Sequence, residues 1–116
     1  GVLTVEVFAN SAMNITAPAN PPYKLTVYRL DGMQRVEQAI NNRLPKTEPE
    51  ARAWMEQNGE RIRRETKSQV INAANGITMA QHYHINRLPA VLINRKVVVY
   101  GMTDVGAAIE RAGGRR

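Results

Sequence analysis

The pattern of apolar and polar positions predicts two strands near the start of the chain. Residues 2–8 (VLTVEVF) and 24–30 (KLTVYRL) are rich in β-branched residues, which favour strands. Residues 9–22, between them, hold three prolines and three asparagines, a composition typical of a loop. This connection is long enough for the crossover that neighbouring parallel strands require.

The middle of the chain has the spacing of amphipathic helices. Asp31 and Gln34 have the spacing of a capping box, so we expect a first helix to begin there and to end before Pro45. Thr47 and Glu50 form a second such pair, with a proline in the first turn, where proline is tolerated. The sequence therefore predicts a second helix from about residue 47.

A longer helical stretch is predicted over residues 60–81. Asn58-Gly59, just before it, is expected to break or kink the helix. The positions expected on its buried side are Val70, Ala73, Ala74 and Ile77.

The last third predicts a β-hairpin followed by a helix. Residues 90–93 and 96–100 (KVVVY) are two short apolar runs, and Asn94-Arg95 is a plausible tight connection between them. Residues 104–112 carry apolar residues on one face, and Gly113 is a natural stop. Asp104 is expected to be a favourable charge in the first turn of this helix.

The order of these elements resembles the thioredoxin fold. It implies one α/β domain over residues 1–116 with a central four-stranded mixed sheet flanked by helices. The first helix of that fold is reduced here to the 9–22 loop. In this fold a cis proline precedes the hairpin, so the resemblance favours a cis bond before Pro89, although most X-Pro bonds are trans.

A second resemblance concerns residues 85–109, which contain LPAVLI followed by KVVVYGMTDVGAAI. This stretch is similar to a thioredoxin-like family of uncharacterised proteins carried on bacterial integrating conjugative elements. The similarity extends to the layout of nearly the whole chain. It implies a role in conjugative transfer and export to the periplasm, with a secretion signal that is not part of this chain.

The absence of cysteine excludes the chemistry of redox thioredoxins. Disulfide exchange needs an attacking thiolate, and Asn10-Ser11-Ala12-Met13-Asn14 stands where the Cys-x-x-Cys motif would be. The candidate partner-binding residues at this position are Ser11, Met13, Asn14, Leu88 and Pro89. Ser11 has two interpretations: it assists glutathione, as hydroxyls near this turn do in glutathione-binding relatives, or it is simply a turn residue. The second is favoured, because no activating base is recognisable nearby.

Other chemistry-bearing residues favour structural roles. His82 and His84 have metal-ligand character, but a zinc site normally needs three or four ligands and no third stands out. The apolar residues Met13, Ile15 and Tyr23, on the proline-rich loop, are either pinned to the core or exposed for a partner. The formal net charge of +6 raises the alternative of nucleic-acid binding. However, the basic residues of the central helix are interleaved with glutamates, as on a solvated face.

These observations lead us to expect a non-catalytic accessory protein of a conjugative transfer system that acts through protein contacts. Its expected partners are other proteins of the transfer apparatus. We expect no catalytic residues, no cofactor, no metal, no nucleic acid and no transmembrane segment. Two alternatives stay open: a glutathione-binding or glutathione-dependent protein using Ser11, and a basic nucleic-acid-binding protein.

Overall fold

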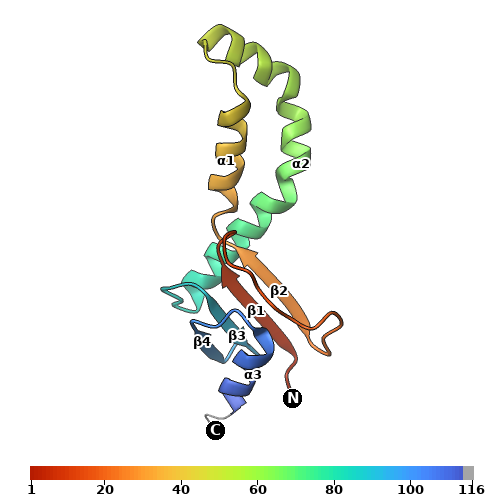
Figure 1. Ribbon diagram of the computed structural model, residues 1–116, viewed down its shortest axis with the longest axis vertical. Coiled ribbons are helices and arrows are strands. Elements are labelled where there is room, and N and C mark those ends of the chain that lie inside the picture. The colour runs from red at the N-terminus through yellow and green to blue at the C-terminus, as the bar shows by residue number, and fades with distance from the viewer. Residues whose placement is uncertain (114–116) are drawn as a thin grey trace.

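The sheet and helices follow the predicted order (Figure 1), in a computed structural model that describes residues 1–113. The elements are β1 (Thr4–Ala9), β2 (Lys24–Arg29), α1 (Gly32–Arg43), α2 (Glu48–His82), β3 (Ala90–Ile93), β4 (Val97–Tyr100) and α3 (Val105–Gly113). The strands form one sheet in the order β2-β1-β3-β4. Strands β1 and β2 are parallel, and the β1–β3 and β3–β4 pairs are antiparallel. The predicted α/β class and mixed four-stranded sheet are confirmed.

Two apolar clusters cover opposite faces of the sheet, because side chains alternate along each strand. The first cluster joins Val5 and Val7 of β1 to Val105 and Ala108 of α3. The second joins Phe8 of β1 and its neighbours to the C-terminal part of α2. In Figure 1 α3 lies in front of the sheet, and the lower end of α2 passes behind it.

The β1–β2 connection contains no helix, as predicted, and it is pinned to the rest of the domain. The Thr16 N–H donates to the Thr103 carbonyl at 2.9 Å, and the Val105 N–H donates to the Thr16 carbonyl at 2.8 Å. Met13, Ile15 and Tyr23 pack against the first apolar cluster. Of the two alternatives for these residues, the pinned arrangement is the one observed.

Helix α2 is continuous over 35 residues, so the predicted break at Asn58-Gly59 is wrong. The side-chain amide of Asn58 donates to the Trp54 carbonyl at 2.9 Å, and its oxygen accepts from Arg61 at 2.8 Å. Both bonds hold Asn58 within the helix. The cap at its start is confirmed, since the Thr47 hydroxyl accepts a hydrogen bond from the Glu50 N–H at 3.4 Å.

The helices α1 and α2 together form an arm that extends beyond the sheet (Figure 1). The molecule measures 61 × 27 × 23 Å along its principal axes, and the arm lies along the longest of them. Trp54 lies on this arm, beneath the guanidinium of Arg43 at 5.7 Å from the ring centroid. It is half-buried and belongs to neither sheet cluster.

The buried face of α2 is rotated about the helix axis relative to the predicted face. Ala73, Gly76 and Ala80 are buried, whereas Ala74 is exposed. A side chain at Gly76 would come within 2.6 Å of the Tyr28 Cβ, so the missing side chain lets α2 lie against β2. A hydrophobic stripe does not reveal this position, because glycine does not count as apolar.

Asn72 ties α2 to the outer edge of the sheet. Its side-chain oxygen accepts from the Arg29 N–H at 2.8 Å, and its amide donates to the Val27 carbonyl at 2.9 Å. Strand β2 is an edge strand, and unpaired edge groups invite pairing with other chains. Asn72 therefore satisfies part of this edge from within the molecule.

No helix in residues 1–113 combines the length and apolar character needed to cross a membrane.

Candidate functional sites

The Asn10–Asn14 turn, which the thioredoxin resemblance identifies as the candidate site, follows the end of β1 and lies near the start of β3. The pairing of Phe8 with Ala90 places the Asn10–Asn14 turn next to Pro89. The peptide bond between Leu88 and Pro89 is cis, as the resemblance predicts. Candidate residues from two distant parts of the sequence thus meet at one end of the sheet.

Ser11 is held by Asp31 at this position. The Ser11 hydroxyl and the Ser11 N–H both donate to the same Asp31 carboxylate oxygen, at 2.8 and 2.9 Å. Asp31 makes no side-chain capping bond to α1, so the capping box predicted there is wrong. Its carboxylate fixes the turn instead. Both donors anchor the turn, which fits a structural role for Ser11. The expectation that no base lies near Ser11 is wrong, since the Asp31 carboxylate accepts a hydrogen bond from its hydroxyl.

Arg29 completes the support of the turn. One nitrogen of its guanidinium donates to the carbonyl oxygens of Asn10 and Met13, at 2.8 and 2.6 Å. These bonds satisfy carbonyl groups that no strand or helix partner reaches. The turn is therefore fixed by the guanidinium of Arg29 and by the carboxylate of Asp31.

The five candidate residues do not all face one another. Met13 packs against the cluster beneath α3, whereas Leu88 packs against the cluster beneath α2, on the opposite face. Ser11 and Asn14 are exposed, and Pro89 is half-buried. Binding at this surface stays a prediction, and it would use the exposed residues and the adjacent backbone.

His82 is the last residue of α2, and His84 follows it two residues later. The rings of His82 and Tyr83 meet edge to face with centroids 4.7 Å apart, and His84 has a positive φ of 55°. Within residues 1–113 no group of three or more histidine, cysteine, aspartate or glutamate side chains is placed to hold a metal ion.

A buried carboxylate on β1 forms a polar cluster that the sequence analysis missed. Glu6 is 4% exposed, accepts from the Tyr28 hydroxyl at 2.9 Å and pairs with the Arg95 guanidinium at 3.0 Å. Burial, followed by the hydrogen bond to Glu6, raises the pKa of Tyr28 to about 12. A small pocket of about 110 Å³ opens beside the cluster, with Lys24 and Thr26 in its wall. The only signal in the sequence is one charged residue inside an otherwise apolar strand.

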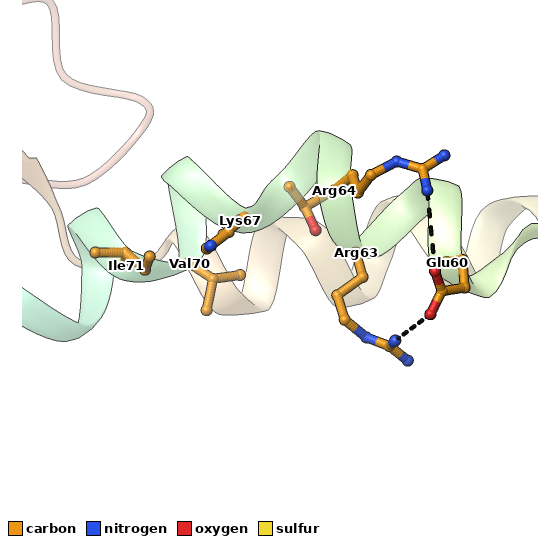
Figure 2. A pocket seen from close by; sticks show the side chains of 7 residues that line it. Glu60, Arg63, Arg64, Lys67, Val70 and Ile71 are labelled. Carbon is orange, nitrogen blue, oxygen red and sulfur yellow. Dashed lines mark hydrogen bonds and ion pairs between the residues drawn. The ribbon is translucent and has the colours of Figure 1, made fainter.

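A second concave surface lies along α2, within the arm, and is lined by residues of this helix alone. This groove has a volume of about 500 Å³. The residues that line it are Glu60, Arg63, Arg64, Thr66, Lys67, Val70 and Ile71. Figure 2 shows them following one another along the helix, with Glu60 paired to two arginines. The groove therefore combines an apolar floor with a mainly basic rim.

Comparison with known proteins gives a family but no activity. No curated protein and no solved structure matches the chain. One family model does match, over residues 2–114, which is nearly the entire chain. The chain therefore belongs to the family described as protein of unknown function (DUF1525).

Proposed function

We propose that this chain is a non-catalytic, thioredoxin-like accessory protein of a bacterial conjugative transfer system that acts through contacts with other proteins. The observation that carries the proposal is the α1–α2 arm, which extends along the 61 Å axis of the molecule. An arm that extends beyond its own sheet offers surface on several sides to other molecules.

The distribution of exposed apolar residues supports a role in protein contacts. Three of the five large apolar residues that are most exposed, Met33, Met55 and Ile71, lie on α1 and α2. Contiguous exposed apolar surface rimmed by polar residues marks sites of protein interaction. The other two, Leu3 and Val97, lie just before β1 and at the start of β4, whereas most apolar residues of the sheet are buried in two internal clusters.

The proposal excludes catalysis at the thioredoxin position. The chain contains no cysteine, so no thiolate can form there. The Ser11 hydroxyl donates its hydrogen to Asp31, which makes the pair an anchor for the turn. The assignment to conjugative transfer, and with it a periplasmic location, rests on the similarity of residues 85–109 to proteins of integrating conjugative elements.

Deletion of the gene in donor cells tests the role. We expect a lower transfer frequency, restored by the wild-type chain and equally by Ser11→Ala. Mild crosslinking in donor cells, followed by purification of the chain, should recover proteins of the transfer apparatus. Unimpaired transfer after deletion, together with recovery of no such protein, would overturn the proposal.

Calorimetry with glutathione separates this role from the glutathione alternative. We expect no heat of binding at millimolar glutathione. Binding that Ser11→Ala abolishes would instead assign the turn to glutathione and contradict a purely structural role for Ser11.

A further inference from the structure

We infer that the groove along α2 receives an acidic, amphipathic helix of a partner protein. The inference rests on the proposed function, since it names the kind of segment that the arm binds. It depends on three features of the groove: its apolar floor, its charge and its direction.

The floor of the groove is apolar. Ile71 is 47% exposed and Val70 is half-buried beside it. The aliphatic stems of arginine and lysine side chains extend this surface, because such side chains keep only the charged end in water. Burial of this floor would give a partner an apolar contact in addition to ionic ones.

The rim of the groove is positively charged. Arg63 and Arg64 share a single carboxylate, Glu60, at 3.3 and 3.9 Å. Lys67 takes part in none of the ion pairs observed in residues 1–113. Three cations against one carboxylate leave an excess of positive charge, which favours a partner that carries carboxylates.

The groove runs along the helix axis, which favours a helical partner. Glu60, Lys67 and Ile71 are seven and four residues apart, so they follow one face of α2 (Figure 2). A helix lying alongside would repeat this spacing with its own apolar and acidic residues. In a second copy of the chain packed on this groove through its own groove, the same cations would face each other and repel. Nucleic acid would gain nothing from the apolar floor.

A synthetic peptide provides the probe. It is an amphipathic helix with leucines on one face and glutamates beside them, and its matched control has lysines in place of the glutamates. Fluorescence anisotropy with the full chain should show binding of the glutamate peptide and none of the lysine peptide. The double variant Arg64→Glu/Lys67→Glu should weaken binding about tenfold, because two favourable charge pairs become repulsive.

Control variants separate loss of the groove from loss of the fold. Arg35→Glu changes the charge of an exposed residue on α1, outside the groove, and should leave the affinity within about twofold of wild type. Ile71→Ser makes the most exposed apolar residue of the floor polar without adding charge and should also weaken binding. Circular dichroism must show unchanged helix content and Tm for each variant.

Four results would overturn the inference: no binding at millimolar peptide, equal binding of both peptides, wild-type affinity of the double variant, or duplex DNA displacing the peptide from the groove. The proposed function fails by a different result, an unimpaired transfer frequency after deletion. If the double variant restores transfer and still crosslinks to the transfer proteins, the groove assignment fails while the proposed function stands.

Discussion

Glu6 is a charged side chain placed inside the sheet, where its burial is offset by specific partners. An ionised carboxylate is costly to bury unless hydrogen bonds and an opposite charge compensate. The Tyr28 hydroxyl supplies the hydrogen bond, and Arg95 supplies the charge from the turn between β3 and β4. The cluster thus links three parts of the sheet that are distant in sequence.

The raised pKa of Tyr28 predicts a loss of stability at alkaline pH. An ordinary tyrosine, as in the unfolded chain, loses its proton near pH 10.0, whereas folded Tyr28 keeps it until about pH 12. The contribution of Tyr28 is therefore complete below pH 10.0 and disappears as the pH rises towards 12. Urea unfolding of wild type and Tyr28→Phe across this range should show a steeper decline for wild type. Parallel declines would contradict the assignment.

At the scale of elements, α2 depends on small residues where it meets β2. Ala73, Gly76 and Ala80 recur on the buried side of the helix at intervals of three and four residues. A Cβ added at Gly76 would lie 2.6 Å from the Tyr28 Cβ and 2.9 Å from the Leu30 Cδ1. The helix can therefore approach the strand closely enough for Asn72 to reach the strand backbone.

Two glycines of the same helix predict opposite effects of the same substitution. Gly76→Ala would place a Cβ 2.6 Å from the Tyr28 Cβ and should lower the free energy of unfolding by roughly 1–3 kcal/mol. A Cβ at Gly59 would lie 3.9 Å from its nearest neighbouring atom, the Met55 Cε, so it fits. Gly59→Ala should raise the free energy of unfolding by about 0.5–1 kcal/mol, because alanine favours helices. Chemical denaturation measures both. Destabilisation by Gly59→Ala would show that the helix is strained there.

At the scale of the whole molecule, the sheet is packed against more neighbouring elements than the arm is. Strand β1 is covered on both faces and paired on both edges. The far end of the arm packs α1 only against α2, around half-buried residues such as Ile40 and the buried Ile62. Regions with fewer buried contacts open more readily in the native state.

Hydrogen exchange should reveal this difference. We expect the amides of β1 and β3 to exchange slowest, since they open only with the whole domain. Those of residues 44–58, at the far end of the arm, should exchange at least tenfold faster, as expected for local opening. Equal protection of the two regions would contradict the view that the arm opens independently of the sheet.

The sequence predicts the sheet well, because strand patterns and turn residues are local signals. The hairpin after Pro89 and the loop in place of a first helix are both present. The arm was not predicted, since nothing local shows that Asn58-Gly59 stays helical or that two helices lie away from the sheet. The sequence predicted where the candidate site lies, but it did not predict which side chains surround it. Asp31 and Glu6 act through partners more than 15 residues away, which no spacing rule reveals.

The arm also has a consequence for how far the protein can reach. Because α1 and α2 run antiparallel and meet the sheet only at their base, their far ends can be lengthened without altering any strand. One added turn in each helix, roughly 3.6 residues apiece, would extend the reach by roughly 5 Å. Under the proposed function, the length of α1 and α2 would set the distance between the sheet and a protein bound at the far end of the arm.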